Sequence, residues 1–255
     1  MKKWFLFTIL LSSQIFFGAT CAPTGNKTES EITKVVVLVH GYMRTKHSMR
    51  FLEKELSLDG YQVINETYPS VENSLEENAD FLNNAIVSRT KMIKGKHEIY
   101  LVTYSMGGLV SRCYLNKYQP KSAIRMVMIA PPNRGSIRAE FFSDLPFSKT
   151  LLGPSGMELS KGEKYLRKLC GGTPDIPFGI IAGGKGDTEG YSHQIPGDDD
   201  GTVSVWSTYL PGSSDFILLK HQHTFMCYHK DVIDNTKNFL EYEDFLLHST
   251  PPINK

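Results

Sequence analysis

The chain has 255 residues, and its 28 lysines and arginines against 27 aspartates and glutamates leave a formal net charge of +1. A hydrophobic share of 40% and a charged share of 22% are typical of a globular protein with one large domain or two small ones. With this nearly balanced charge, nothing in the composition indicates binding to nucleic acid or broad electrostatic attachment to a membrane.

The N-terminal segment predicts export. Two lysines follow Met1, residues 4–18 are largely apolar, and small residues precede Cys21. This pattern is typical of a secretory signal peptide over residues 1–21, and it is too short for a stable membrane-spanning helix. Cys21 resembles the lipidation site of bacterial lipoproteins, although Thr20 replaces the usual residue before it. A membrane-anchored lipoprotein, a periplasmic protein and a secreted protein are therefore all open.

Beyond a polar tether at residues 22–33, apolar segments alternate with helical patterns. Strands are predicted at residues 35–39, 61–64, 98–103, 124–129, 178–181 and 216–219. Helices are predicted at residues 46–58, 106–118 and 231–247. A further helix is predicted to begin at a capping box formed by Ser74 and Glu77. Continuous apolar strands are buried on both faces, so the chain is predicted to be α/β, with a compact, mostly parallel sheet of about six strands and helices on both faces.

A long insert follows the fourth predicted strand. Residues 131–175 contain glycine, proline and serine together with scattered apolar residues. Such an insert is either a cap over a functional site or a structural excursion that does not contact substrate. We expect one domain over residues 34–248, with this insert inside it.

Three cysteines lie beyond Cys21. An odd number allows at most one disulfide within the chain. Cys113 falls on a predicted helix and is expected to be a small buried residue. Cys170 and Cys227 could pair, which the sequence alone does not decide.

The residues from Ile99 to Gly108 carry the strongest chemical signal. An apolar strand ends at Ser105, and a helical pattern begins at once with Gly107 and Gly108. A serine at a sharp strand-to-helix turn is typical of a nucleophile elbow, in which small flanking residues let the helix approach the strand. The usual pattern is Gly-x-Ser-x-Gly, and Thr103 replaces its first glycine.

Two backbone N–H groups are predicted to form an oxyanion site. One belongs to Met106, which follows the serine at a helix N-terminus, where negative charge is favoured. The other is assigned to Tyr42, in the loop after the first strand, where Gly41 lets the backbone turn inward. We interpret the neighbouring His40 as a structural residue that holds this loop.

A serine nucleophile requires a base and an acid. In the type of fold that carries a nucleophile elbow, these come from later loops in the chain order serine, acid, histidine. His221 and His223 both follow the last predicted strand, where a loop can direct an imidazole at the serine. The acid should come from residues 198–200, where Asp200 is the best match and Asp198 and Asp199 are expected to be solvated. Asp187 is the reserve candidate.

Taken together and in order, these segments resemble the α/β-hydrolase superfamily, in its small bacterial lipase and esterase branch. The segments that carry the resemblance are residues 37–41, 103–108, 130–136, 200–203 and 223–226. The resemblance implies the α/β-hydrolase fold, with Ser105 as nucleophile, Asp200 as acid and His223, rather than His221, as base.

The resemblance also implies cleavage of carboxylic esters through an acyl-enzyme, with no metal or organic cofactor. The expected partner is a small-molecule or lipid ester, with no nucleic acid and with membrane association only through a lipidated Cys21. The same residues would serve an exported acyltransferase or an esterase of phospholipids or cell-wall esters. A non-catalytic, tethered binding module on a hydrolase scaffold is the alternative from another class of protein.

Overall fold

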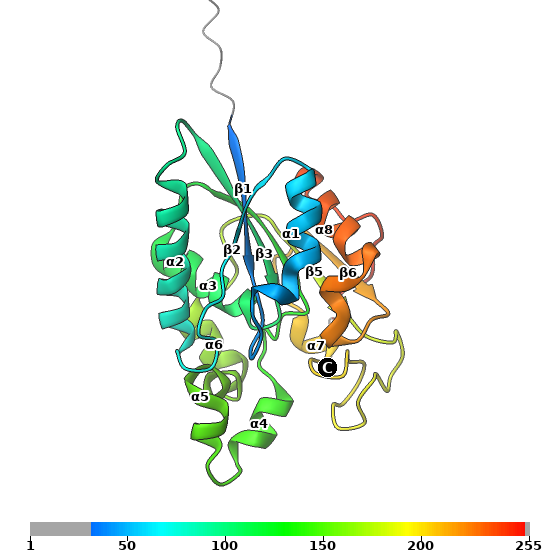
Figure 1. The fold of residues 1–255 in the computed structure, drawn as a ribbon. Helices are drawn as coiled ribbons and strands as arrows, with labels where there is room; N and C mark the ends of the chain where they lie inside the picture. The colour runs from blue at the N-terminus through cyan, green and yellow to red at the C-terminus, as the bar shows by residue number, and fades with distance from the viewer. Residues whose placement is uncertain (1–31, 253–255) are drawn as a thin grey trace, which may run out of the picture. The chain divides into compact units, whose positions relative to one another are not determined.

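Six parallel strands form a sheet in the order β2-β1-β3-β4-β5-β6 in the computed structural model, which describes residues 32–252 (Figure 1). The strands are β1 (Thr33–Val39), β2 (Gln62–Asn65), β3 (His97–Tyr104), β4 (Ala123–Ile129), β5 (Phe178–Gly183) and β6 (Asp215–Leu219). The predicted α/β class with about six parallel strands is confirmed. The predicted signal peptide, Cys21 and most of the tether lie outside the described residues.

Both faces of the sheet are buried. In β1, Val35, Val37 and Val39 face one hydrophobic cluster and Val36 and Leu38 the other, and each is at most 2% exposed. This alternation explains the continuous apolar strands, because every position meets a packed layer. Helices α2 (Leu75–Thr90), α3 (Gly107–Tyr118) and α6 (Gly162–Cys170) contribute to the first cluster, and α1 (Arg50–Leu58) and α8 (Lys230–Tyr242) contribute to the second (Figure 1).

Two helix ends test the sequence signals directly. The capping box is confirmed, because the Ser74 side chain accepts the Glu77 N–H and the Glu77 carboxylate accepts the Ser74 N–H. The closing helix, predicted to reach residue 247, instead ends at Tyr242. Glu243 adopts a left-handed conformation with φ of 64°, and the chain turns so that Phe245 is buried.

The insert consists of three helices: α4 (Ile137–Ser143), α5 (Ser148–Leu159) and α6. Helix α5 is interrupted at Gly153, which has φ of 60° and precedes Pro154. A Cβ atom on Gly153 would lie 2.1 Å from the carbonyl oxygen of Val71, so glycine allows α5 to contact the loop before α2. The remaining short helices are η1 (Lys46–Met49), α7 (Val205–Thr208) and η2 (His223–Tyr228). No helix within residues 32–252 is long and apolar enough to cross a lipid bilayer.

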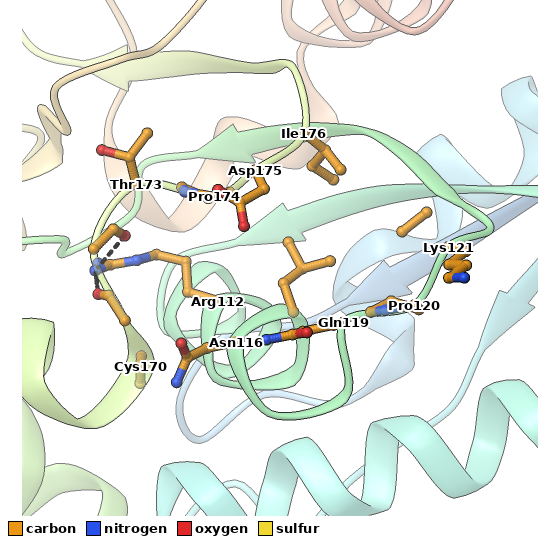
Figure 2. A pocket seen from close by; sticks show the side chains of 14 residues that line it. Arg112, Asn116, Gln119, Pro120, Lys121, Cys170, Thr173, Pro174, Asp175 and Ile176 are labelled. Carbon is orange, nitrogen blue, oxygen red and sulfur yellow. Dashed lines mark hydrogen bonds between the residues drawn. The ribbon is translucent and has the colours of Figure 1, made fainter.

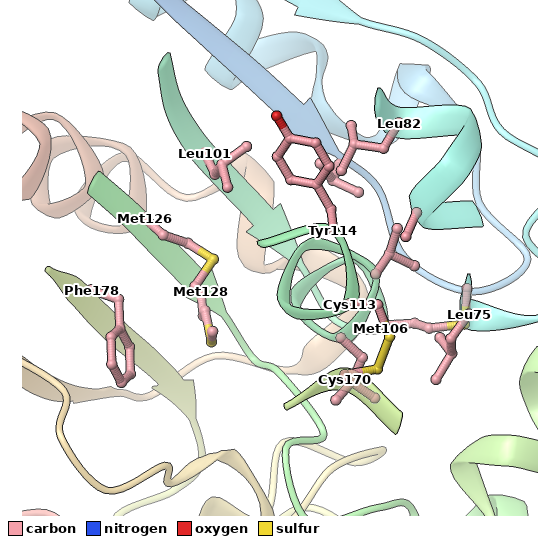
Figure 3. Close-up of a cluster of buried hydrophobic side chains, with 14 of the residues drawn as sticks. Leu75, Leu82, Leu101, Met106, Cys113, Tyr114, Met126, Met128, Cys170 and Phe178 are labelled. Carbon is pink, nitrogen blue, oxygen red and sulfur yellow. A yellow bond between two sulfur atoms is a disulfide. The ribbon is translucent and has the colours of Figure 1, made fainter. Parts of the chain in front are cut away.

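A disulfide joins Cys113 on α3 to Cys170 at the end of α6 (Figure 3). Cys113 is buried, as expected, but it is bonded to Cys170 instead of serving in packing alone. The pairing of Cys170 with Cys227, which the sequence left open, does not occur. The physical reason is the sheet, because Cys113 and Cys170 belong to the cluster on one face and Cys227 to the cluster on the other. Cys227 is buried as a free thiol.

Arg112, next to this disulfide, also binds the end of α6. Its guanidinium donates to the carbonyl oxygen of Gly171 at 2.7 Å (Figure 2). It also donates to the side-chain oxygen of Asn133 at 3.1 Å. Burial lowers the pKa of Arg112 to about 10, because the charged form loses its water. A cavity of about 310 Å³ lies beside Arg112 and Cys170. The arginine and the disulfide together hold α6 to α3.

Removal of the disulfide should destabilise the protein. The bond closes a loop with a sequence separation of 57 residues, so its loss frees the unfolded chain. Such a bond contributes roughly 2–4 kcal/mol to the free energy of unfolding. Urea unfolding of the wild type with and without reductant, and of the Cys113→Ala, Cys170→Ala double variant, measures this. Reductant should destabilise the wild type alone. An equal response in the double variant would contradict the assignment.

Candidate active site

Ser105 lies at a sharp turn between β3 and α3. Its φ of 54° is in the left-handed region, which a residue other than glycine rarely adopts. The turn is held because the Ser105 N–H donates to the carbonyl oxygen of Ile129 on β4 at 2.8 Å. On the helix side, a Cβ atom on Gly107 would lie only 2.2 Å from the carbonyl oxygen of Val39. Glycine at position 107 therefore lets α3 begin directly against β1.

Thr103 fits where the usual pattern has glycine. It is fully buried, and its hydroxyl donates to the carbonyl oxygen of Val127 on β4 at 3.2 Å. A Cβ atom on Gly108 would lie 3.5 Å from the Thr103 hydroxyl oxygen, at ordinary contact distance. The hydroxyl is thus paired, and the helix has room for the larger side chain.

Three side chains from separate loops meet at this turn. The Ser105 Oγ lies 3.0 Å from the Nε2 of His223, and the Nδ1 of His223 lies 2.6 Å from the Oδ2 of Asp200. His223 is 6% exposed and Asp200 is 1% exposed, so the chain of hydrogen bonds is largely shielded from water. With Nδ1–H donating to the carboxylate, Nε2 is left free to accept the serine proton.

Backbone contacts hold the imidazole and the carboxylate in place. The His223 N–H donates to the carbonyl oxygen of Asp200 at 2.8 Å, and the Asp200 Oδ1 accepts the N–H groups of Thr202 and Val203. The Tyr104 hydroxyl donates to the carbonyl oxygen of His223 at 2.7 Å. Sequence reasoning missed Tyr104, and its position directly before Ser105 was the available signal.

Asp187, the reserve acid, takes no part in this arrangement. It is fully exposed in its loop, and its carboxylate accepts the N–H groups of Glu189 and Gly190. These two hydrogen bonds lower its pKa, because they stabilise the charged form. Of the acids considered, only Asp200 contacts His223 within the described part of the chain.

Asp198 and Asp199 are structural. The expectation that both are solvated is wrong for Asp199, while Asp198 remains partly exposed. Asp199 is fully buried, and its carboxylate accepts the N–H groups of Ser192 and Gly201. Burial is the largest influence on Asp199 and raises its pKa. Asp198 accepts two N–H groups from residues 185 and 186. Both carboxylates therefore shape the loop that presents Asp200.

The second candidate base, His221, lies elsewhere. Its Nε2 is 2.8 Å from the Asp231 carboxylate, and its ring stacks on His229 with 3.6 Å between centroids. Burial, followed by the neighbouring His221, lowers the pKa of His229. These three side chains place ligand atoms within 4.8 Å of one another, so a cation could bind there. Of the two histidines, His223 is the one that contacts the serine.

His40 holds the loop after β1, as expected. It is fully buried, and its Nδ1–H donates to the carbonyl oxygen of Gly41 at 2.9 Å, while its Nε2 accepts the N–H of Tyr68 at 3.2 Å. These partners require the neutral imidazole. Burial lowers the pKa of His40 to about 4, which agrees with that requirement.

The contact from His40 also orients the peptide that follows it. The Gly41 carbonyl and the Tyr42 N–H belong to one planar trans peptide and point in opposite directions. The carbonyl is held by His40 and by the N–H of Arg44 at 3.2 Å. A Cβ atom on Gly41 would lie 3.0 Å from the Cβ of Ser105, so this peptide passes directly beside the serine.

Two backbone donors are free at this point. Within residues 32–252, neither the Tyr42 N–H nor the Met106 N–H donates to a protein acceptor. Met106 follows Ser105 directly and precedes the first residue of α3, where the helix dipole favours negative charge. These are the two groups that the sequence predicts as oxyanion donors.

A cavity of about 220 Å³ opens beside Ser105 and His223. Its apolar wall comes from α4 and α5 of the insert and consists of Ala139, Phe142, Leu152 and Leu159. The lining also includes polar groups, among them Arg44 from the loop after β1 and Thr224 in η2. The arrangement combines a hydroxyl in contact with an imidazole, two free N–H donors and an apolar surface.

Several solved structures have a fold similar to that of this chain. The mature Bacillus licheniformis lipase BlEst2 is 18% identical, with 82% of this chain and 90% of that chain covered and a TM-score of 0.61. The chain spans 52% of the propeptide form of that lipase, with a TM-score of 0.66. The Pyrococcus furiosus esterase PF2001 is 17% identical, with 82% and 81% covered and a TM-score of 0.54. The chain has the α/β-hydrolase fold.

At these identities the likeness shows the fold alone. The chain matches no protein-family model and no curated protein sequence. The α/β-hydrolase fold carries many chemistries, so the chemistry of this chain has to be argued from its own site.

The buried His40 should make stability depend on pH. In the unfolded chain its pKa is 6.5, whereas in the folded protein it is about 4. Between these values the unfolded state binds a proton that the folded state does not. The contribution of His40 to the free energy of unfolding is therefore complete above pH 6.5. Roughly 3 kcal/mol of it is lost as the pH falls toward 4. Urea unfolding at pH 7 and pH 4.5 measures this loss. The loss of stability should be smaller in His40→Asn than in the wild type. An equal loss in the two proteins would contradict its assignment to His40.

Proposed function

We propose that this protein is a serine hydrolase that cleaves carboxylic esters through an acyl-enzyme. The observation that carries the proposal is the continuous hydrogen-bonded series from the Ser105 hydroxyl through His223 to Asp200. A serine hydroxyl is a weak nucleophile at neutral pH unless a base removes its proton during attack. The buried carboxylate holds the imidazole in the tautomer that does so.

The proposed reaction has two halves. The Ser105 oxygen attacks the ester carbonyl carbon while its proton passes to the Nε2 of His223. The tetrahedral intermediate then collapses, and the imidazolium returns that proton to the leaving alcohol. Water replaces the alcohol, loses a proton to His223 and attacks the acyl-enzyme. The acid is released and the serine hydroxyl is restored.

Negative charge on the carbonyl oxygen is stabilised by the N–H groups of Tyr42 and Met106. Both donors belong to backbone that is fixed before substrate arrives, so no reorganisation is needed in the transition state. The Gly41–Tyr42 peptide is fixed by the hydrogen bond from His40. We assign His40 as a positioning residue for this donor.

The insert supplies the surface for the acyl part of the substrate. Four apolar side chains from α4 and α5 line the cavity beside the serine, namely Ala139, Phe142, Leu152 and Leu159. Burial of acyl methylene groups there contributes about 0.8 kcal/mol for each group. We therefore propose that residues 131–175 act as a cap within a hydrolase domain over residues 34–248.

We propose that the protein is exported. The basic and apolar N-terminal pattern supports export, and so does the disulfide, because such bonds persist in oxidising compartments. Attachment to a membrane through a lipid on Cys21 is the proposed alternative to release. Mass spectrometry of the purified mature protein distinguishes a diacylated Cys21 from a cleaved, unmodified N-terminus.

The proposed roles predict severe losses on substitution. Ser105→Ala and His223→Ala should each lower the turnover of a p-nitrophenyl ester at least about a thousandfold with folding intact. Asp200→Asn should also be severe, because it removes the charge that stabilises the imidazolium. Asp187→Asn is the matched control and should turn over the ester at the wild-type rate. A greater loss in Asp187→Asn than in Asp200→Asn would overturn the acid assignment.

A fluorophosphonate probe separates the enzyme from a binding module on a hydrolase scaffold. Covalent labelling of the wild type that disappears in Ser105→Ala is expected of an activated serine. Absence of labelling in folded wild-type protein would refute the proposed activity.

His40 should affect the rate of reaction more than substrate binding. His40→Leu removes the donor to the Gly41 carbonyl and releases the peptide that carries the Tyr42 N–H. We expect kcat to fall about tenfold or more, with a small change in KM. His40→Asn can keep a donor at the same place and should retain more of kcat. Steady-state kinetics on variants shown to be folded measures both. Equal losses in the two variants would refute the positioning role.

A further inference from the structure

The cavity beside Ser105 is lined by two arginines and by no acidic residue. Arg44 comes from the loop after β1, and Arg138 lies in the first turn of α4. Among the cavity-lining residues within 32–252, none is an aspartate or a glutamate. Asp200 is buried behind His223, where its carboxylate is already hydrogen-bonded by the imidazole and two N–H groups.

Neither guanidinium is neutralised by the protein. The Nη1 of Arg138 donates to the carbonyl oxygen of Gly201 at 2.8 Å, and the Nη2 of Arg44 lies 3.4 Å from the Thr224 hydroxyl oxygen. Over residues 32–252, neither arginine has a carboxylate oxygen within 4 Å, whereas Arg125 is paired with a glutamate. Each arginine therefore keeps its full charge and several unused N–H donors at the cavity wall.

We propose that Arg44 and Arg138 bind an anionic group, a phosphate or a carboxylate, on the alcohol part of the ester. This inference rests on the proposed ester hydrolysis and names its substrate class. Guanidinium groups match both anions in charge and in hydrogen-bond geometry. The hydroxyls of Ser136, Thr202 and Thr224 line the same cavity and supply neutral donors beside the two charges.

The contacts of the arginines indicate the alcohol side. Arg44 contacts Thr224, the residue after His223, and His223 is the group that returns the proton to the leaving alcohol. Arg138 contacts Gly201, the residue after Asp200. Both guanidiniums thus attach to the loops that carry the base and the acid. The apolar side chains of α4 and α5 remain for the acyl chain, so the preferred ester has an apolar acid and an anionic alcohol.

The test compares esters that share an acyl chain and differ in charge. One pair is 4-nitrophenyl butyrate and 3-carboxy-4-nitrophenyl butyrate, which adds a carboxylate to the leaving group. The other is 1-octanoylglycerol and 1-octanoylglycerol 3-phosphate, below their micellar concentrations, with released octanoate measured. We expect the wild type to have a kcat/KM at least about fivefold higher for the anionic member of one or both pairs at low salt. The pair with the larger ratio identifies the anion as carboxylate or phosphate.

Variants assign the preference to the two arginines. The Arg44→Gln, Arg138→Gln double variant should lose most of the anionic-to-neutral ratio, and the lysine versions of both should retain part of it. Lys149→Gln is the matched control, because it removes one exposed positive charge from α5 outside the cavity and should keep the wild-type ratio. The use of a ratio cancels any general loss of activity. Added salt should reduce the ratio in the wild type more than in the double variant.

Two results would overturn the inference. One is a wild type that hydrolyses neutral esters at least as well as both anionic partners, and the other is a double variant that keeps the wild-type ratio. Failure of the proposed function is distinct, because Ser105 would then not be labelled by the fluorophosphonate and neither charged nor neutral esters would be hydrolysed. Arg44 is exposed, so Arg44→Gln alone tests the inference if the Arg138 variant does not fold.

Discussion

The strained backbone of Ser105 is the constraint on which the rest of the site depends. A left-handed conformation at a serine is unfavourable, and it persists because its N–H is bonded to Ile129 of β4 and its carbonyl oxygen to Gly108 of α3. The same turn brings the hydroxyl to the imidazole of His223 and places the N–H of Met106 at the start of a helix. Substitution of Gly107 would bring a side chain into the backbone of β1, so this glycine is required by packing.

The polar groups around the serine form two layers with different functions. The inner layer is the series of Ser105, His223 and Asp200. In the proposed reaction His223 takes up and returns the proton of the Ser105 hydroxyl, while Asp200 orients the imidazole. The outer layer fixes the inner one: Tyr104 binds the carbonyl of His223, and His40 binds the carbonyl beside the Tyr42 N–H. Support of this kind is needed because a shift of about 1 Å in a reacting group can lower the rate a hundredfold.

Much of this arrangement could be predicted from the sequence because it depends on local signals. Six apolar strands, the capping box at Ser74 and the glycines after Ser105 each act over a few residues, and all were confirmed. The end of α8 at Tyr242 was missed because a left-handed Glu243 has no clear sequence signature. The pairing of Cys113 with Cys170 depends on which face of the sheet each segment packs against, which no local pattern records. The burial of Asp199 depends on how its loop folds around the carboxylate, which accepts the N–H groups of Ser192 and Gly201.

The bond between Cys113 and Cys170 links the redox state of the surroundings to α3, the helix that begins at Gly107, two residues after Ser105. Glutathione and thioredoxin keep thiols reduced in the cytosol, so there α3 and α6 would be joined only by noncovalent contacts. Under the proposed export, this covalent link between the two helices would form only after the chain has left the cytosol.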